Sequence, residues 1–266
     1  MRISVIVTTY NNPGYLKRVL DCFPAQRRIP DELIVADDGS GPETGECVSA
    51  FARKSAFPVR HVWHEDKGFR LAGIRNEAIK AAGGDYIVIM DGDCLPGRHF
   101  VSDHTRLAMR GFFVQGKRIM VGQKASQNIS HEKINSILPT ASMLFSGEIS
   151  NSHHLFRLPW LPPLTKTALR GIKGCNMAFW RDDLLAVNGY NEAFSGWGRE
   201  DSEIAVRLYR YGLKRREHPF MACCYHLWHP DNSRDTLTYN DRILEDTMKS
   251  HSFRCSLGID KDSSVQ

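Results

Sequence analysis

Short β-branched runs alternate with amphipathic segments along the first third of the chain. The predicted strands are 3–7, 32–36, 59–63 and 86–90, and the predicted helices between them are 15–23, 43–54 and 70–82. Each strand is a short apolar run bounded by polar turn residues, whereas the helices repeat apolar residues at three- and four-residue spacing. This alternation predicts an α/β fold in which a Rossmann-like, mixed but mainly parallel sheet is flanked by helices.

The pattern is less regular in the remainder of the chain. Helices are predicted at 99–110, 181–187, 202–211 and 237–250, and strands around 113–121, 171–180 and 222–228. The stretch from about 126 to 167 follows neither period, and long irregular segments of this kind are often lids or binding loops. Its apolar cluster at 155–164 is mixed with basic residues, so both internal packing and contact with a membrane interface fit.

Polar residues directly follow three of the predicted strands. They are Thr8 and Tyr10 after the first strand, Asp37 and Asp38 after the second, and Asp91 and Asp93 after the fourth. Because the carboxyl ends of parallel strands meet at one edge of a sheet, we expect these clusters to converge there. The sequence therefore predicts a polar ligand site at this edge.

The sequence Asp91-Gly92-Asp93 places two carboxylates two positions apart, so they share a side if the strand geometry continues. Gly92 allows a ligand to approach the backbone closely. Carboxylate oxygens suit Mg²⁺ or Mn²⁺, which often take further ligands from substrate phosphates. Acidic pairs are also frequent in turns that bind no metal, so the metal hypothesis depends on the other polar clusters at this edge.

Two histidines, His226 and His229, flank Trp228 near the end of the last predicted strand. Either imidazole can complete the coordination of Mn²⁺, and either can equally be a hydrogen-bonded structural residue. The residues alone do not choose between these roles or between the two histidines.

The segment 194–203 brings two adjacent acids, Glu200 and Asp201, to the start of the helix predicted at 202–211. One interpretation is that a bendable loop positions a general base. The other is that the carboxylates stabilise the free N–H groups and the dipole of the helix N-terminus. The aromatic ring of Trp197 in the same loop can hold the loop against the core.

Composition adds limits on the class of protein. A chain of 266 residues with 42% hydrophobic content is expected to form one large domain with a sizeable core. The net charge of +5 favours anionic partners but is too small to indicate nucleic acid. Seven scattered cysteines without a CxxC pair indicate reduced thiols, and neither a secretion signal nor a spanning segment is evident. We therefore expect a cytoplasmic protein, and a peripheral position on the inner face of the cytoplasmic membrane is compatible with this expectation.

Five ordered motifs resemble those of a known family. The stretches 3–11, 33–40 and 91–93 closely resemble the three N-terminal signatures of family 2 glycosyltransferases with the GT-A fold. The stretches 174–179 and 196–201 resemble the C-terminal half shared with chondroitin-polymerase-like enzymes and β-1,4-galactosyltransferases. The resemblance implies a GT-A domain over 1–230, with a nucleotide-sugar half at 1–98 and an acceptor half at 99–230, followed by a helical extension and tail at 231–266.

The resemblance also implies roles for residues of the nucleotide-sugar half. Thr8, Tyr10 and Asp38 would hold the nucleobase and ribose of a UDP-sugar, with Asp38 accepting a hydrogen bond from a uracil N–H. Arg70 would lie near the base or the diphosphate. Asp91 would face the ribose or the donor sugar.

The metal and the catalytic base follow from the same resemblance. Asp93 would bind Mn²⁺ or Mg²⁺ with His226, and His229 remains the alternative ligand. Asp201 would be the general base, and Glu200 would help to hold donor or acceptor hydroxyls.

Three further residues, Asn176, Gly196 and Trp197, would contact the acceptor or the transferred sugar in such an enzyme. One position departs from the galactosyltransferase type, in which a further acidic residue often follows the catalytic pair. Ser202 stands here instead, so the acceptor contacts are expected to differ.

The function implied is inverting, metal-dependent transfer of a hexose or N-acetylhexosamine from a UDP-sugar to a hydroxyl of a surface glycan or glycolipid. The expected acceptor is a lipopolysaccharide, an O-antigen or a capsule, reached with a possible peripheral membrane contact. Two alternatives are a nucleotidyl or sugar-nucleotide enzyme on a similar site and a non-catalytic module that binds sugar nucleotides or glycans. The acids at 200 and 201 argue against the module, because binding alone needs no positioned base.

Overall fold

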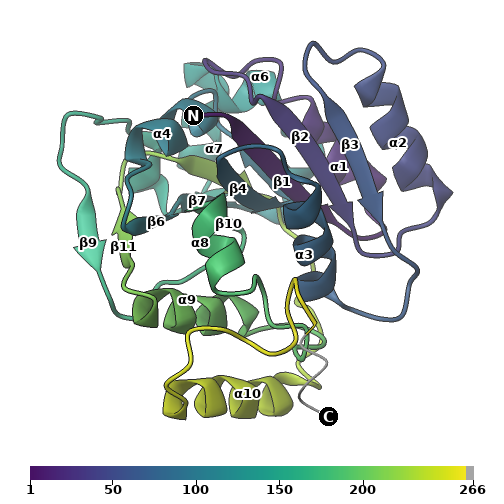
Figure 1. Ribbon diagram of the computed structural model, residues 1–266. Coiled ribbons are helices and arrows are strands. Elements are labelled where there is room, and N and C mark those ends of the chain that lie inside the picture. The colour runs from purple at the N-terminus through teal and green to yellow at the C-terminus, as the bar shows by residue number, and fades with distance from the viewer. Residues whose placement is uncertain (262–266) are drawn as a thin grey trace.

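The computed structural model describes residues 1–261, and within them the main sheet has eight strands in the order β3-β2-β1-β4-β10-β6-β11-β9 (Figure 1). The strands are β1 (Ile3–Thr9), β2 (Glu32–Asp37), β3 (Val59–Trp63), β4 (Tyr86–Asp91), β6 (Phe112–Gln115), β9 (Leu164–Lys166), β10 (Asn176–Trp180) and β11 (Lys214–Glu217). The first four pair in parallel, as predicted. Strand β10 runs antiparallel to both β4 and β6, so the sheet is mixed.

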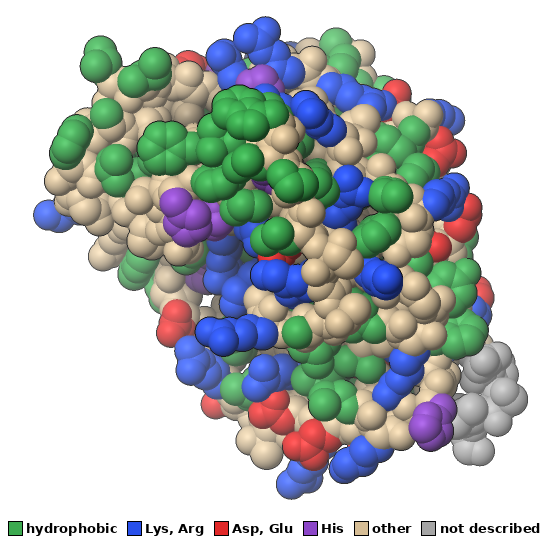
Figure 2. Space-filling model, turned by 90° about the vertical axis from the view of Figure 1, so that its left-hand side faces the viewer, with side chains coloured by type: hydrophobic (Ala, Val, Ile, Leu, Met, Phe, Trp, Pro, Cys, Tyr) green, Lys and Arg blue, Asp and Glu red, His purple; other side chains and the backbone are tan. Residues whose placement is uncertain are grey.

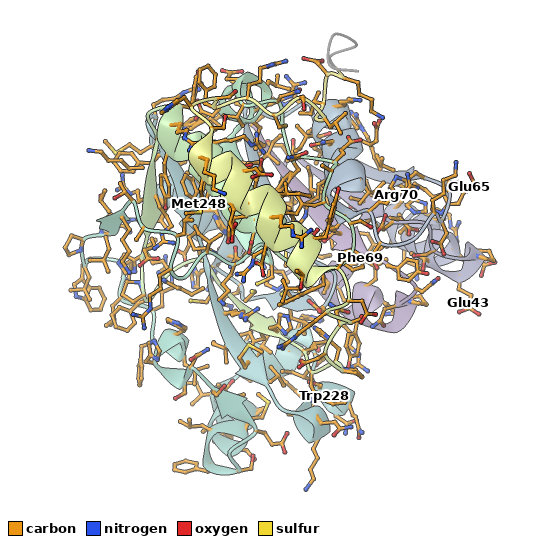
Figure 3. All side chains as sticks on the ribbon, turned by 90° about the horizontal axis from the view of Figure 1, so that it is seen from below. Glu43, Glu65, Phe69, Arg70, Trp228 and Met248 are labelled. Carbon is orange, nitrogen blue, oxygen red and sulfur yellow. The ribbon has the colours of Figure 1, made fainter. Side chains whose placement is uncertain are left out.

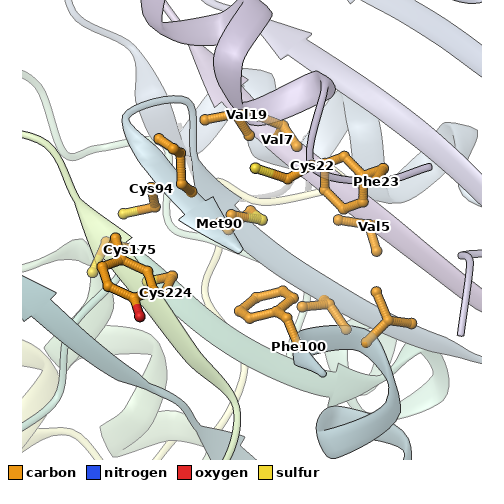
Figure 4. Close-up of a cluster of buried hydrophobic side chains, with 14 of the residues drawn as sticks. Val5, Val7, Val19, Cys22, Phe23, Met90, Cys94, Phe100, Cys175 and Cys224 are labelled. Carbon is orange, nitrogen blue, oxygen red and sulfur yellow. The ribbon is translucent and has the colours of Figure 1, made fainter. Parts of the chain in front are cut away.

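Alternation along β1 divides its side chains between two cores. Val5 and Val7 pack with Val19 and Phe23 on one face, beside α1 (Pro13–Leu20) and α2 (Pro42–Ala52) (Figure 4). Ile6 points to the other face, which is covered by α3 (Leu71–Ala81), α8 (Arg181–Ala186) and α9 (Glu200–Arg210). Because both faces of the central strands are covered, these strands are apolar along their whole length rather than on alternate residues.

A second sheet was not predicted. It has the order β5-β12-β7-β8, formed by β5 (Cys94–Pro96), β12 (Cys223–His226), β7 (Lys117–Val121) and β8 (Ile149–Ser150). The single strand predicted around 113–121 is therefore wrong, because β6 and β7 belong to different sheets. Gly116 lies between them, where a Cβ would come within 2.2 Å of the Asn176 side chain. The bare backbone of glycine allows the chain to pass from one sheet to the other.

The stretch around 126–167 has more regular structure than predicted. After α4 (Phe100–Leu107), it contains α5 (Gln123–Asn128), α6 (His131–Ile134), α7 (Ile137–Phe145) and the 3₁₀ helix η1 (Ser152–Leu155). Helix α7 buries none of its side chains, and Ile137 and Phe145 are 86% and 89% exposed. Figure 2 shows hydrophobic side chains gathered over the upper part of one face of the molecule. Across residues 1–261, no helix combines the length and apolar character needed to span a membrane.

The predicted C-terminal helix is present as α10 (Leu237–Lys249), which packs against α9 (Figure 1). Asn240 on α10 is fully buried. Beyond this helix the chain returns to the domain, where the side-chain amide of Asn188 donates hydrogen bonds to the carbonyls of Cys255 and Asp260. The extension is therefore packed onto the domain that precedes it, and the division at residue 230 remains a prediction.

Replacing Gly116 with alanine tests the crossing between the sheets. The new methyl group would displace the Asn176 amide, which donates to the carbonyls of Lys117 and Ala222. We expect the free energy of unfolding to fall by about 3 kcal/mol in urea titrations. The matched variant Gly97→Ala places its methyl at an ordinary 3.5 Å from the Cys223 carbonyl and should change stability little. Equal losses in both variants would contradict this account of Gly116.

Candidate functional site

A cleft of about 1070 Å³ lies at the carboxyl edge of the parallel strands. Its wall combines the ends of β1 and β4, the start of α9 and the chain after β12. The predicted site residues that line it are Thr8, Tyr10, Asp38, Asp91, Asp93, Trp197, Glu200, Asp201, His226 and His229. The convergence predicted from three strand ends is thus present in the structure.

Thr8 and Asp91 face each other across neighbouring strands. The hydroxyl of Thr8 donates to Oδ1 of Asp91 at 2.9 Å, because Thr8 and Asp91 are partners in the parallel register of β1 and β4. The N–H of Gly92 donates to the Thr8 carbonyl at 2.7 Å. A Cβ on Gly92 would lie 2.7 Å from that oxygen, so glycine lets the chain turn tightly after Asp91. This turn directs Asp93 toward the histidines of the second sheet.

Asp93, His226 and His229 form the candidate metal centre, with one ligand atom from each within 4.8 Å of the others. Nε2 of His229 is 3.2 Å and Nε2 of His226 is 3.7 Å from Oδ2 of Asp93. Burial acts to raise the pKa of Asp93, but the hydrogen bond from His229 and the charges of both histidines outweigh it and lower the pKa. The hydrogen bond to Asp93 in turn raises the pKa of His229 to about 9. Both histidines that were weighed as alternatives therefore reach the same carboxylate.

The donor atoms fit a divalent cation. Nδ1 of His229 lies 2.7 Å from the Pro230 carbonyl, and as an N–H donor there it leaves Nε2 free to face Asp93. A histidine ligand is commonly oriented in this way by a hydrogen bond from its other nitrogen. The buried Nδ1 of His226 has no hydrogen-bond partner among residues 1–261. One carboxylate and two imidazoles can bind Mn²⁺ while leaving positions for phosphate oxygens.

Tyr10 and Asp38 line the cleft after the first two strands, where the family resemblance predicts the nucleoside. The phenol of Tyr10 donates to Asp66 at 2.9 Å. Asp38 is buried and accepts hydrogen bonds from Nε2 of His64 at 2.6 Å and from the Arg70 N–H at 2.9 Å. Burial raises the pKa of Asp38, although these two hydrogen bonds act against the rise.

Arg70 and Asp37 are placed differently from the prediction. The Arg70 guanidinium donates to the Glu65 carbonyl at the outer side of the molecule (Figure 3) and does not line the cleft. Its backbone N–H, rather than its charge, supports the site by holding Asp38. Asp37 is fully buried against His61 and accepts from the Ser40 N–H, so it stabilises the turn after β2.

Arg75 is a site residue that the sequence analysis missed. It comes from α3, is 1% exposed and lines the floor of the cleft. Its guanidinium contacts Asp91 at 3.1 Å and Glu200 at 3.2 Å, and it lies over the Tyr190 ring at 5.1 Å. Arginine at a helical position normally indicates a solvated face. The only indication of a buried role in the sequence was that position 75 lies next to inward-facing residues of the predicted amphipathic helix.

Glu200 and Asp201 occupy the first turn of α9. The helix follows Arg199, which has a φ of 81° and no capping side chain. Oδ2 of Asp201 accepts from the Gly174 N–H at 2.9 Å, and Oδ1 accepts from the Ser202 N–H at 2.6 Å. The carboxylate is therefore held at the cleft wall in one orientation. The Ser202 hydroxyl contacts Asp201 rather than capping the helix.

The pKa of Glu200 is shifted strongly. The side chain is 12% exposed, and burial together with the neighbouring Asp201 charge raises its pKa to about 7, despite the nearby Arg75. Two carboxylates that are adjacent and largely buried resist simultaneous ionisation. Glu200 is thus the member of the pair that holds a proton at higher pH than usual.

The loop before α9 is held by the C-terminal helix. The side-chain amide of Asn240 donates to the carbonyls of Ser195, Trp197 and Gly198 at 3.0, 3.3 and 3.0 Å. The Trp197 ring is 41% exposed at the cleft and has Arg234 5.7 Å from its centroid. Its position leaves a face for a sugar, while its backbone is fixed by α10.

Gly196 and Asn176 do not have the positions expected of sugar contacts. Gly196 does not line the cleft, and it has a φ of 69° with its N–H donating to the Phe69 carbonyl, so it shapes the loop. Asn176 is 1% exposed, and its Oδ1 lies 2.9 Å from Nε2 of His104. Its amide nitrogen is occupied by the two carbonyls that it holds at the junction of the sheets. The polar atoms of the Asn176 side chain are therefore all used inside the core, which leaves none of them to contact a sugar.

Comparison with known sequences agrees with this geometry. The profile described as "Glycosyl transferase family 2" matches residues 4–173, and that described as "N-terminal domain of galactosyltransferase" matches residues 163–230. Chondroitin synthase from Escherichia coli is 28% identical over 252 residues, which cover 88% of this chain and 36% of that protein. Hyaluronan synthase from Pasteurella multocida is 28% identical over 228 residues, which cover 79% of this chain and 23% of that protein. The chain thus spans about a third or less of these two relatives.

Solved structures resemble the whole fold. S. aureus TarS 1–349, also solved in complex with UDP, matches with a TM-score of 0.62 and 16% identity, over 93% of this chain and 65% of that one. The mannosyltransferase PcManGT from Pyrobaculum calidifontis, in complex with GDP-Man and Mn²⁺, matches with a TM-score of 0.55 and 21% identity. The match covers 94% of this chain and 62% of that one. The predicted GT-A fold is confirmed.

The three hydrogen bonds of Asn240 predict a mechanical role for α10. Asn240→Ala leaves the loop carbonyls without their donor, and we expect the unfolding free energy to fall by about 1–3 kcal/mol. Hydrogen exchange of the amides at 195–198 should accelerate by more than it does in Thr238→Ala, an exposed position on the same helix. Exchange that is equal in the two variants would show that α10 does not hold the loop.

Glu200 predicts a pH dependence of stability. Its proton is lost near pH 4.5 in the unfolded chain and near pH 7 in the folded one, so the folded state binds more protons between these values. Stability should therefore fall as pH rises through this window, by up to about 3 kcal/mol from this group. Urea unfolding of Glu200→Gln at a series of pH values should lack this decrease. Glu77→Gln, on an exposed face of α3, should retain it, and parallel curves for Glu200→Gln and the unaltered protein would contradict the assignment.

Proposed function

This chain belongs to glycosyl transferase family 2, and we propose that it transfers a hexose or N-acetylhexosamine from a UDP-sugar to a glycan hydroxyl with inversion at the sugar carbon. One observation carries the proposal: a Mn²⁺- or Mg²⁺-compatible triad and an oriented Asp201 carboxylate line one cleft. The triad is suited to hold a cation against the diphosphate of the donor. The carboxylate is suited to accept the proton of the acceptor hydroxyl.

On the donor side, we assign the nucleoside to the end of the cleft formed by Tyr10 and Asp38. The exposed ring of Tyr10 offers a surface for the base, and the fixed carboxylate of Asp38 offers a hydrogen-bond acceptor. Asp93, His226 and His229 would hold the cation, which when bound would offset the charge of the departing diphosphate. Asp91 is fixed by Thr8 and Arg75 and is placed to contact the ribose or the donor sugar.

On the acceptor side, Asp201 accepts the proton of the attacking hydroxyl. The N–H groups of Gly174 and Ser202 fix both of its oxygens, so little reorientation is needed when the proton moves. Burial and the charge of Asp201 raise the pKa of Glu200 to about 7, so its protonated carboxyl group can donate a hydrogen bond to a sugar hydroxyl. Trp197 offers a sugar platform at the same wall.

The acceptor is proposed to be a growing surface glycan, as in a lipopolysaccharide, O-antigen or capsule. The named products of the matched relatives, chondroitin and hyaluronan, support a polysaccharide acceptor. Exposed Phe156 and Trp160, in the segment after η1, support a peripheral membrane contact for an acceptor carried on lipid.

The Asp201→Asn variant separates binding from chemistry. Calorimetric titration with UDP should give Mn²⁺-dependent binding that is equal in this variant and the unaltered protein, because Asp201 is not a member of the triad. Transfer should fall by about 10²- to 10⁴-fold, the usual contribution of a positioned base. Asp182→Asn, on an exposed side chain, is the matched control and should retain full activity. Retained turnover in Asp201→Asn would contradict the assignment of Asp201 as the base. UDP binding that does not depend on metal would contradict the assignment of the triad as the metal site.

A further inference from the structure

A second cavity, of about 420 Å³, adjoins the main cleft, and we call it the side pocket. The two cavities share Arg118, Met120, Lys173 and Cys175 in their walls. The remaining lining of the side pocket includes Lys117 and His154. It is therefore continuous with the cleft but has a different, basic lining.

The side pocket adjoins the acceptor side of the cleft. Gly174, whose N–H holds the Asp201 carboxylate, lies between Lys173 and Cys175, and both of these line the two cavities. Among residues 1–261, the lining of the side pocket includes neither Asp93 nor the two candidate metal-binding histidines. A group bound there would be next to the proposed base and outside the candidate diphosphate site.

The electrostatics of the side pocket favour an anion. Arg118 is partly buried, and its guanidinium contacts Sγ of Cys175 at 3.6 Å. Within the described part of the chain, no carboxylate forms an ion pair with Arg118 or with Lys173. A guanidinium removed from water without a counter-ion is costly, and it is the side chain best suited to binding a planar anion with two hydrogen bonds.

The acid that pairs with Lys117 does not neutralise this region. Glu217 accepts from Lys117 at 3.1 Å, but the same carboxylate also pairs with Lys166 and with Arg215 at 3.7 Å. One negative charge therefore faces three cations before Arg118 and Lys173 are counted.

Neutral polar groups complete the side pocket. Nδ1 of His154 lies 2.6 Å from the Pro219 carbonyl. When this nitrogen carries the proton and donates to the carbonyl, Nε2 of the neutral ring is left as an acceptor. Burial lowers the pKa of His154, which keeps the ring neutral. Asn151 also lines the cavity. Such groups suit the hydroxyls of a sugar ring that carries the anion.

We propose that the side pocket binds an acidic group on the acceptor, either a uronate carboxylate or a glycosyl phosphate, close to the hydroxyl that receives the sugar. Arg118 makes the principal contact and Lys173 attracts the anion at the mouth. This inference rests on the proposed function and specifies its acceptor class. It predicts selection for acidic over neutral acceptors.

The test compares three acceptors built on one oligosaccharide: one ending in a hexuronate, its carboxyl-reduced neutral counterpart, and one ending in a glycosyl phosphate. The donor is a UDP-sugar that the enzyme hydrolyses slowly with Mn²⁺ when no acceptor is present. We expect kcat/KM to be about 10- to 100-fold higher for at least one acidic acceptor than for the neutral one. Whichever acidic acceptor is preferred identifies the source of the anion.

Variants then assign the selectivity to the side pocket. Arg118→Gln should remove the preference, Arg118→Lys should restore part of it, and Lys173→Gln should reduce it, each with an unchanged KM for the donor. Lys214→Gln removes the same charge from an exposed position outside both cavities and should keep the full preference. If Arg118→Gln does not fold, as judged by circular dichroism, the Lys173→Gln variant still tests the inference, because Lys173 is exposed and its replacement should not disturb folding.

Two results would overturn the inference. Equal use of all three acceptors by the unaltered enzyme would exclude an acidic acceptor. An increase in the donor KM in Arg118→Gln, with the acceptor preference retained, would place Arg118 at the diphosphate instead. Donor hydrolysis that requires Mn²⁺ in the same assays would show that the proposed function stands although this inference fails. Absence of metal-dependent donor hydrolysis would count against the proposed function itself.

Discussion

The buried guanidinium of Arg75 connects the two halves of the active-site cleft. It contacts Asp91 at the end of β4 and Glu200 at the start of α9, two elements that are far apart in the sequence. Without this cation, two carboxylates would face each other at the floor of the cleft with little water to screen them. Removing one member of such a buried arrangement is typically far more destabilising than losing an exposed ion pair. The distance between the proposed donor end and the proposed catalytic pair therefore depends on Arg75.

Other contacts hold the parts that Arg75 connects. Gly174 fixes the Asp201 carboxylate from the strand β10 side, and Asn240 fixes the loop before α9 from the C-terminal helix. The second sheet brings His226 beside Asp93 through the pairing of β12 with β5. Each of these contacts joins segments separated by at least 27 residues. The cleft is thus a product of the whole fold rather than of any one motif.

The sequence predicted those parts of the site that follow from local rules. Runs of β-branched residues located four parallel strands, and the geometry of a parallel sheet then placed Thr8, Asp38 and Asp91 at one edge. The two histidines could not be separated from sequence because their roles depend on β12 pairing beside β5, which is a long-range contact. Arg75 was missed because an arginine inside an amphipathic helix looks the same whether it faces water or a buried carboxylate.

Errors arose where one residue type serves two environments. Asn176 was assigned to a sugar contact, but a buried amide that satisfies backbone carbonyls has no distinct local pattern. The family resemblance placed Arg70 near the base or the diphosphate, whereas in the structure its backbone N–H holds Asp38. The stretch 113–121 was predicted as one strand because apolar residues stand at both of its ends. The change of sheet at Gly116 depends on the neighbouring Asn176 side chain, which lies 60 residues further along the chain.

The central claim is that a cation and a nucleoside diphosphate meet between the two halves of this cleft. A crystal structure of the protein with UDP and Mn²⁺, with the metal located by its anomalous scattering, tests this claim most directly. We predict one Mn²⁺ bonded to Asp93, His226 and His229 and to the diphosphate, with the uracil beside Tyr10 and Asp38. A manganese peak away from this triad, or UDP bound outside the cleft, would contradict the account.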